Sequence, residues 1–518
     1  MNWNTPITRR DALKLTAGSM TLLGLGAQEA AAAGNGPRMN VVFFMTDQER
    51  AIQHFPAGWE QQNLPGLTRL KQNGLSFNNA FTDACMCSPA RSTLMTGYFP
   101  AQHGVKYTLE EDMPARLYPQ VELPLNLKNI ATVMTAAGYN VVYKGKWHCS
   151  KPSGKHWVRV NLDRYGFNRW DPQDAGANQD LDQAGGGIAN NDGRFMHDNG
   201  QWEAGREGAI AYLTSVAAKQ QPFFLIISLV NPHDVLVYPN NYLQAGYDNS
   251  WLEGDIDIPA TIHEDLSTKP TVQEEFRLLS QALGVLDTPE KQRNYLNFYG
   301  NLMKSSDNYL VEVLDTLENE GLLDNTLLIR TADHGEMGLT HHGQRQKNFN
   351  FYEESIRIPL VYSNPRLYPS PRATDALVSH VDFLPTIANL FNAPAGARAS
   401  WQGIDYSRLI LDPSAQPVQD YIVFTYDDSQ SGQKNGPYPT PPNHIASIRE
   451  ARYKLAEYYD ANGRVPSQYE MYDLLEDPLE RDNIACRLAE RTLEQKQQYE
   501  RLRLKLQAVK AQRLQPLG

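Results

Sequence analysis

Four short apolar runs, each followed directly by charged or imidazole side chains, constrain the fold of this chain most. Their branched and aromatic residues are typical of strands buried on both faces of a parallel sheet. Open α/β sheets bind their ligands at the carboxyl ends of such strands. The pattern therefore predicts an α/β fold, with a large, mixed but mostly parallel sheet flanked by helices and a site at one sheet edge. The runs are residues 39–45, 139–143, 222–230 and 325–330.

Two of these runs end in groups that suit a metal ion. Asp47 and Gln48 follow the first run, and Asp333 and His334 follow the fourth. A single aspartate after a strand is more often a turn or helix cap. Two such pairs in the same strand context instead offer two carboxylates, an amide oxygen and an imidazole, a mixed and mainly hard donor set. These four residues are therefore candidate ligands of a divalent cation.

The other two runs release basic side chains. Lys146 and His148 lie two positions apart in the tetrapeptide Gly-Lys-Trp-His, so in an extended segment both point to the same face. His233 follows the third run in Asn-Pro-His-Asp. These three residues are candidates for binding an anionic substrate and for moving protons.

Cys87 begins the run Cys-Ser-Pro-Ala-Arg. The proline is placed where the first turn of a helix tolerates it, so a helix is expected here with its positive end facing position 87. Arg91, one turn in, can hydrogen-bond back toward that position. A buried free cysteine that acts as a small hydrophobe is the alternative interpretation. Cys85 lacks proline and arginine at these offsets.

These motifs resemble those of the type I sulfatases, formylglycine-dependent enzymes of the alkaline phosphatase superfamily. The pattern C-x-P-x-R at residues 87–91 and G-K-W-H at 145–148 match closely, and the resemblance extends over nearly all of residues 40–485. It implies an alkaline-phosphatase-like fold and a sulfuric ester hydrolase. It further implies that a formylglycine-generating enzyme converts Cys87 to formylglycine (3-oxoalanine).

The resemblance also implies a role for each candidate. The metal would be held by the modified Cys87, whose hydrated aldehyde attacks sulfur, together with Asp47, Gln48, Asp333 and His334. Lys146 and Lys347 would hold the sulfate oxygens. His233 would protonate the departing alcohol, and His148 would take the proton from the second hydroxyl, which expels sulfate.

The sequence departs from the common family pattern at two places. Gln48 and His334 stand where many members carry Asp and Asn, a variant that resembles choline sulfatases and phosphonate monoester hydrolases. Calcium is the ion implied first, with manganese or magnesium as alternatives. Residues 344–346, Gln-Arg-Gln, replace the usual apolar and glycine residues before Lys347. His341 and the adjacent His342 cannot both face the site, so neither is given a role.

Two other functions remain as alternatives. The first is a phosphonate monoester or phosphodiester hydrolase on the same scaffold, which Gln48 and His334 favour. The second is a non-catalytic periplasmic protein that binds sulfated ligands and keeps an unmodified Cys87. In each case the sequence leaves the alcohol part of the ligand open.

Composition limits the class of protein. With 518 residues, 41% hydrophobic, the chain can bury the core of one large domain and a smaller one. The formal net charge of -11 argues against nucleic acid as a partner. Four cysteines, one of them expected to be modified, do not form a disulfide framework.

The chain divides into three expected parts. Residues 1–33 are a signal peptide, residues 38–414 the catalytic domain, and residues 415–518 a smaller α+β domain with an antiparallel sheet and a terminal helix. Residues 171–200 and the proline-rich residues 432–444 are expected to be long loops. They either shape substrate access or are flexible surface loops without a role.

The signal peptide resembles a bacterial twin-arginine leader. Arg9 and Arg10 precede a weakly apolar run at 15–27, which is too short to span a bilayer, and small residues at 30–33. The resemblance implies the twin-arginine translocase as a partner and a periplasmic or secreted mature protein. No other apolar stretch approaches membrane length, so no membrane contact is expected of the mature form.

Overall fold

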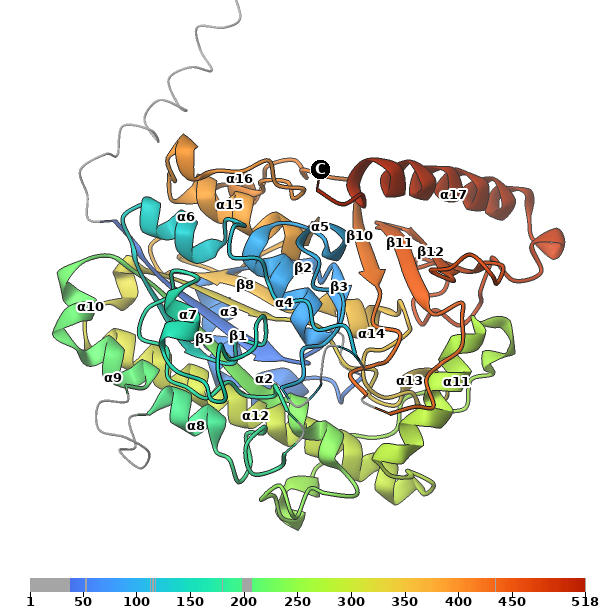
Figure 1. The fold of residues 1–518 in the computed structure, drawn as a ribbon, viewed down its shortest axis with the longest axis horizontal. Coiled ribbons are helices and arrows are strands. Elements are labelled where there is room, and N and C mark those ends of the chain that lie inside the picture. The colour runs from blue at the N-terminus through green and yellow to red at the C-terminus, as the bar shows by residue number, and fades with distance from the viewer. Residues whose placement is uncertain are drawn as a thin grey trace, which may run out of the picture. The chain divides into compact units, whose positions relative to one another are not determined.

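A mixed eight-stranded sheet forms the centre of the protein in the computed structural model (Figure 1). The structure describes residues 38–517 except 52–53, 112, 114–115, 117, 179, 198–206 and 434. Four neighbouring strands, in the order β4–β5–β1–β6, run parallel. They correspond to the four apolar runs, so this prediction is confirmed. Their bounds are Asn40–Asp47 (β1), Asn140–Gly145 (β4), Phe223–Pro232 (β5) and Thr326–Ala332 (β6).

Beyond β6 the sheet becomes mixed. Strand β8 (Leu360–Ser363) runs antiparallel to β6 and to β2 (Gly74–Phe81). Strand β7 (Arg357–Ile358) is antiparallel to β2, and β9 (Arg372–Ser379) is parallel to it. The sheet is thus mixed but mostly parallel, as the sequence predicted.

Helices cover both faces of the central strands, which explains why their sequences are continuously apolar. Phe44 belongs to the same buried cluster as the apolar side chains of α12 (Pro289–Asn319). The next residue back, Phe43, points to the opposite face, and its ring lies 4.9 Å from that of Phe383 in α15 (Phe383–Leu390). Figure 1 shows α12 and α15 on opposite sides of the sheet.

A second sheet of five strands has the order β13–β12–β11–β10–β3. Its four C-terminal strands are antiparallel, as the sequence predicted. The fifth, β3, comes from the N-terminal half of the chain and pairs in parallel with β10. Strand β3 ends two residues before Cys87, so its pairing in the second sheet helps to position Cys87. The bounds are Ala84–Cys85 (β3), Tyr421–Tyr426 (β10), His444–Glu450 (β11), Tyr453–Tyr459 (β12) and Gln468–Asp473 (β13).

The terminal helix α17 (Leu493–Arg513) lies along this second sheet (Figure 1). A stripe of apolar side chains at helical spacing packs onto the strands: Tyr499, Leu502, Leu506 and Val509. Charged side chains of α17 also pair with this sheet, among them Lys505 with Glu450 and Lys510 with Glu457. The terminal helix therefore packs against the second sheet through both apolar and charged contacts.

Shorter helices complete the fold. Helix α4 (Cys87–Thr96) follows β3 at the site edge. The remaining α-helices are α2 (Trp59–Asn63), α3 (Pro65–Gln72), α5 (Pro100–His103), α6 (Ile130–Ala136), α7 (Val160–Asp163), α8 (Asn191–Met196), α9 (Ala209–Thr214), α10 (Val216–Gln220), α11 (Thr271–Leu279), α13 (Thr340–Gly343), α14 (Glu353–Ile356) and α16 (Ser407–Leu411). Within the described residues, no helix combines the length and apolarity needed to cross a membrane.

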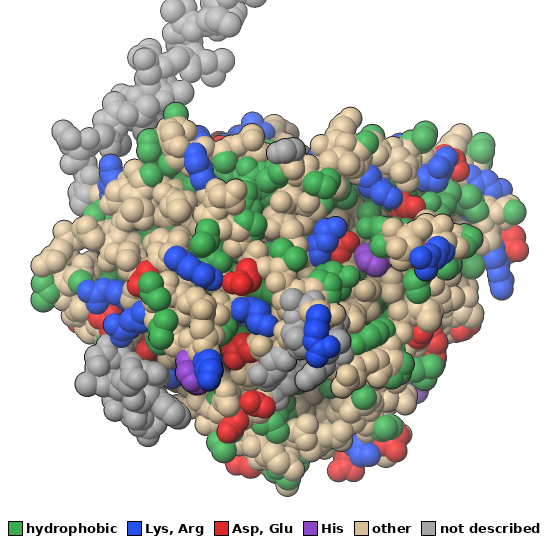
Figure 2. Space-filling model, viewed as in Figure 1, with side chains coloured by type: hydrophobic (Ala, Val, Ile, Leu, Met, Phe, Trp, Pro, Cys, Tyr) green, Lys and Arg blue, Asp and Glu red, His purple; other side chains and the backbone are tan. Residues whose placement is uncertain are grey.

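Residues Asn40–Gly518 form one compact unit. The expected signal peptide lies outside the described residues, and the boundary near residue 415 stays a prediction. Helix α8 interrupts the segment 171–200, which the sequence indicated to be entirely a loop. On the face shown in Figure 2, basic and acidic side chains are interspersed.

Candidate functional site

Cys87 is the first residue of α4 and lies at the centre of the candidate site. Pro89 sits in the first turn, as the sequence predicted, and the helix ends at Gly97 in a left-handed conformation. The Sγ atom of Cys87 is 3.1 Å from Nε2 of His334 and 3.6 Å from Oδ1 of Asp47. Burial raises the pKa of this thiol to about 11. An unmodified Cys87 would therefore be a poor nucleophile at neutral pH.

Four side chains from three elements could hold a metal ion together. Asp47, Cys87, Asp333 and His334 each offer one ligand atom, and these atoms all lie within 4.8 Å of one another. Asp47 ends β1, whereas Asp333 and His334 follow β6, its direct neighbour in the sheet. Parallel pairing thus brings the two distant ligand pairs to one edge.

Arg91 orients both carboxylates of this cluster. Its NH2 donates to Oδ2 of Asp47 at 3.0 Å, and its Nε donates to Oδ2 of Asp333 at 2.9 Å. Its NH1 donates to the backbone oxygen of Lys146 and to Oγ of Ser228. The sequence suggested that Arg91 reaches back to position 87. The structure instead shows Arg91 hydrogen-bonded to Oδ2 of both neighbouring carboxylates. Oδ1 of Asp47 and Oδ1 of Asp333 are left on the side of the candidate metal ligands.

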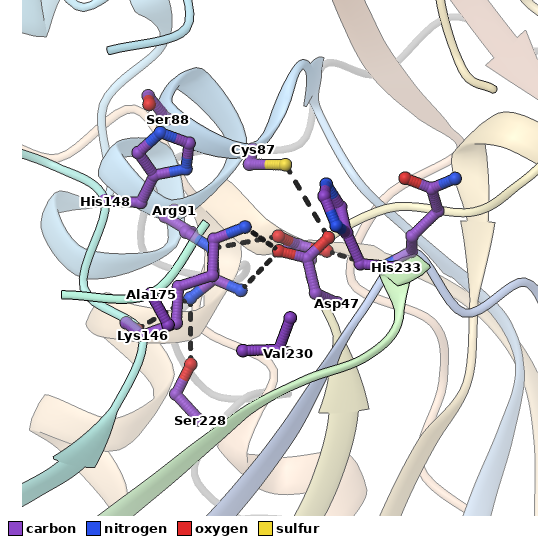
Figure 3. Close-up of polar contacts among 12 residues, drawn as sticks. Asp47, Cys87, Ser88, Arg91, Lys146, His148, Ala175, Ser228, Val230 and His233 are labelled. Atoms are coloured by element: carbon purple, nitrogen blue, oxygen red, sulfur yellow. Dashed lines mark hydrogen bonds and ion pairs between the residues drawn. The ribbon is translucent and has the colours of Figure 1, made fainter. Parts of the chain in front are cut away.

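Lys146 adds a second cation at Asp47, with Nζ 2.6 Å from Oδ2. Figure 3 shows both Lys146 and Arg91 directed toward this carboxylate. Burial alone would raise the pKa of Asp47, but Lys146, His233 and Arg91 hold it well below its ordinary value. Asp47 is therefore ionised, as a metal ligand must be.

Gln48 occupies a different place from the other candidate ligands. Its Oε1 accepts a hydrogen bond of 2.6 Å from Nζ of Lys347, and its Nε2 donates to Oε2 of Glu336 at 2.5 Å. The backbone nitrogen of Gln48 donates to Oδ1 of Asp333 at 3.0 Å. The side-chain oxygen thus faces Lys347, and the role of Gln48 as a metal ligand stays a prediction.

His148 is held at the site by its backbone. Asp174 accepts hydrogen bonds of 2.7 Å from the backbone nitrogens of Trp147 and His148, and His148 has a left-handed φ of 54°. Its Nε2 lies 2.6 Å from the backbone oxygen of Leu109. Burial, and then Lys146, hold the pKa of His148 well below its ordinary value. His148 is therefore neutral and able to accept a proton.

His233 begins the 3₁₀ helix His233–Val237 that follows β5. Its Nδ1 lies 3.9 Å from Oδ1 of Asp234. The other oxygen of Asp234 accepts hydrogen bonds from the Gly186 backbone nitrogen and the Tyr247 hydroxyl. Burial lowers the pKa of His233. Asp234 is thus fixed where it can stabilise a protonated His233.

A pocket of about 610 Å³ opens beside these groups. Cys87, His148, His233 and Lys347 line it. Its walls include residues from both segments that the sequence indicated as loops, among them Asn178, Gly185, Gln433 and Tyr438. Of the two interpretations left open for those segments, shaping access to the site is the one that the structure supports.

Sequence reasoning missed several residues that build the site. Asp174 lies in a Gly/Asn/Asp-rich segment without periodicity, so no pattern identified it. Glu336 was visible in Asp-His-Gly-Glu, but nothing indicated that its carboxylate binds Gln48. Ser228 lies inside the apolar run of β5, where a single hydroxyl gives no sign of a functional contact. Each acts through a contact with a residue far away in the sequence.

Comparisons with known proteins agree on one family. The family model "Sulfatase" matches residues 39–393, and "N-sulphoglucosamine sulphohydrolase, C-terminal" matches residues 340–512. An ulvan-active sulfatase of Formosa agariphila is 25% identical over 86% of this chain and 76% of its own length. A choline-sulfatase of Rhizobium meliloti is 24% identical over 86% and 82%. The structure of a phosphonate monoester hydrolase from Silicibacter pomeroyi superposes with a TM-score of 0.65 and 21% identity, covering 92% of this chain and 96% of that one.

Proposed function

Because this chain belongs to the sulfatase family, we propose that the sulfate ester hydrolysis it catalyses uses a formylglycine formed from Cys87 and a divalent cation. One observation carries the proposal: Sγ of Cys87 lies among the ligand atoms of Asp47, Asp333 and His334 at the amino end of α4. A hydrated aldehyde at this place would supply the attacking hydroxyl. The helix terminus and the cation both favour a negative charge there.

The donor set fits such a cation. Two carboxylates and an imidazole converge with all four cluster residues buried, and Arg91 and Lys146 compensate the outer oxygens of the carboxylates. When bound, the ion would polarise the sulfate and lower the pKa of the attacking hydroxyl. Calcium is the ion that the family resemblance implies, whereas the nitrogen of His334 suits manganese better. Elemental analysis of the purified protein decides between them.

The surrounding side chains divide the remaining work. Lys146, which contacts Asp47, and Lys347, which contacts Gln48, would hold the sulfate oxygens. His233 faces the pocket with Asp234 behind it, an arrangement suited to protonating the departing alcohol. His148 is buried and neutral, as a proton acceptor must be before the second step. Turnover of 4-nitrophenyl sulfate by purified protein, lost on substitution of Cys87, tests the proposal.

A phosphonate monoester hydrolase remains the second candidate. The observation that favours it is the combination of Gln48 and His334, together with the overall likeness to the hydrolase from Silicibacter pomeroyi. Rates with 4-nitrophenyl sulfate and with 4-nitrophenyl phenylphosphonate, measured on one preparation, separate the two. A binding protein with unmodified Cys87 would turn over neither, and the intact mass of the Cys87 peptide would show the thiol retained.

The route to the mature enzyme forms a further part of the proposal. A formylglycine-generating enzyme modifies Cys87, the twin-arginine translocase then exports the folded chain, and the protein works in the periplasm or outside the cell. The paired Arg9 and Arg10 before a short apolar run support this route. Replacing both arginines with lysine should keep the protein in the cytoplasmic fraction of the expressing cell.

A further inference from the structure

Gln346, the residue before Lys347, adopts a backbone conformation that disfavours its side chain. Its φ is 68°, in the left-handed region that glycine adopts readily and that is strained for residues with a Cβ. It also lies in the stretch 344–346, where the sequence departs from the apolar and glycine residues of the family pattern. The strain indicates that the Gln346 side chain has a use at this position.

The backbone of Gln346 is firmly held. Its nitrogen donates to both carboxylate oxygens of Glu336, at 3.0 and 3.1 Å, and its carbonyl oxygen accepts from the nitrogen of Met337 at 2.9 Å. Glu336 also accepts from the hydroxyl of Tyr295 at 2.7 Å and from Nε2 of Gln48. These hydrogen bonds fix the backbone from which the Gln346 side chain extends.

The neighbours of this side chain determine which end of the amide faces them. Oε1 of Gln346 lies 3.4 Å from Nε2 of Gln48 and 3.4 Å from Nζ of Lys347, and both of these atoms are donors. A flipped amide would place its NH₂ group against those two donors. Nε2 of Gln346 therefore points away from Gln48 and Lys347.

That nitrogen has no hydrogen-bond partner among the described residues, although it is buried. Gln346 and Lys347 both line the 610 Å³ pocket that contains Cys87. An unpaired buried donor costs free energy. An acceptor that enters from the pocket would remove this cost.

We propose that Nε2 of Gln346 donates a hydrogen bond to an oxygen of the substrate's sulfate group, beside the oxygen that Lys347 binds. The inference rests on the proposed function, because it presumes that sulfate occupies this end of the pocket. The strained conformation of Gln346 is then the means by which the chain gains a neutral donor next to a cationic one.

Gln346→Gly tests this role. Glycine relieves the backbone strain, so the thermal stability of this variant should equal or exceed that of wild type. The KM for 4-nitrophenyl sulfate and the Kd for inorganic sulfate, measured by calorimetry, should both rise on the order of 10-fold. Gln346→Glu keeps the side-chain length but replaces the donor with a carboxylate, and it should weaken sulfate binding further. Asn392→Gly is the matched control, since Asn392 also has a left-handed φ, 53°, but does not line the pocket.

The calorimetric measurement does not depend on turnover, so it separates this inference from the proposed function. A wild type that binds sulfate but hydrolyses no sulfate ester contradicts the proposed function alone. If Gln346→Gly leaves the Kd for sulfate within twofold of wild type, the Gln346 inference is wrong. The same holds if Gln346→Glu binds sulfate as well as wild type does, or if wild type binds no sulfate.

Discussion

Nε2 of His334 lies 3.1 Å from Sγ of Cys87, although 247 positions separate the two residues in the chain. His334 follows β6, and Cys87 begins α4, so the contact joins the sheet edge to the amino end of a helix. Nδ1 of His334 lies 3.1 Å from the backbone oxygen of Gly335. If Nδ1 carries the proton, it donates a hydrogen bond to that oxygen. The lone pair of Nε2 is then available to a metal beside position 87.

Replacing Cys87 with alanine should lower the turnover of 4-nitrophenyl sulfate ~10³-fold or more, because no other side chain at the site can supply the nucleophile. The thermal midpoint should change little, since the side chain is small. Cys85→Ala is the control: Cys85 lies in β3, packs in a buried cluster with Phe424 and is not one of the four candidate metal ligands. That variant should lose some stability and keep its activity. Substantial activity in Cys87→Ala would rule out the formylglycine mechanism.

Asp333→Asn should reduce activity ~100-fold or more and lower the metal content per chain, because it removes one of the two charges that balance the cation. Excess divalent metal should restore part of the rate. Elemental analysis and titration of the chelated protein with Ca²⁺ and Mn²⁺ measure this. Asp315→Asn is a control, since Asp315 pairs with Arg69 on the surface. A chelated wild type at full activity would show that no metal is needed.

His233→Ala should slow the reaction most for alcohols of high pKa, because poor leaving groups depend on a proton from a general acid. A series of aryl sulfates, with log rate plotted against leaving-group pKa, should give a steeper slope for the variant than for wild type. Asp234→Asn should give an intermediate slope, because Asp234 would affect the proton transfer by stabilising protonated His233. Equal losses for good and poor leaving groups would require another role for His233.

His148→Ala should instead affect the second half of the reaction. Alcohol release should show an initial burst approaching one equivalent per active site, followed by slow turnover, because His148 acts only after the alcohol has left. Rapid-quench measurement with 4-nitrophenyl sulfate detects the burst. Its absence, with an unaltered dependence on the leaving group, would mean that His148 does not serve as this base.

The stability that His341 contributes should fall as the pH rises from 6.5 to 9. Burial alone would lower the pKa of this imidazole, but Glu264 and Glu354 raise it to about 9. Nδ1 lies 2.8 Å from Glu264, and the ring stacks on Tyr352. The folded state thus binds the proton more tightly than the unfolded state, whose pKa is about 6.5. The stabilisation is complete below pH 6.5 and is lost as the pH rises through 9.

His341→Asn should therefore lower the free energy of unfolding by on the order of 2 kcal/mol at pH 6, and the gap from wild type should shrink toward pH 9.5. Urea unfolding at both pH values measures it. His342→Asn is matched, because both histidines have left-handed φ angles, 48° and 66°, which asparagine tolerates. A gap that does not vary with pH would show that His341 is neutral in the folded protein.

The sequence alone determined the parts of this protein that depend on local pattern. Continuous apolar runs are typical of strands buried on both faces of a covered parallel sheet, so β1, β4, β5 and β6 were predictable, although each strand begins one residue later and ends two residues later than its run. Because parallel strands share one carboxyl edge, the meeting of Asp47 with Asp333 was predictable too. Cys87 stood out because its helix start and arginine lie within five residues.

Only the tertiary structure decided which side chains meet at that edge and how they are turned. Nothing local to Gln48 shows that its amide oxygen faces Lys347 while its nitrogen binds Glu336. Asp174 holds His148 from a segment without periodicity, and the strand β3 joins a sheet formed more than 300 residues later. These contacts depend on directions of hydrogen bonds between elements that are distant in sequence. Such directions are fixed by how the helices and sheets pack, which no short stretch of sequence encodes.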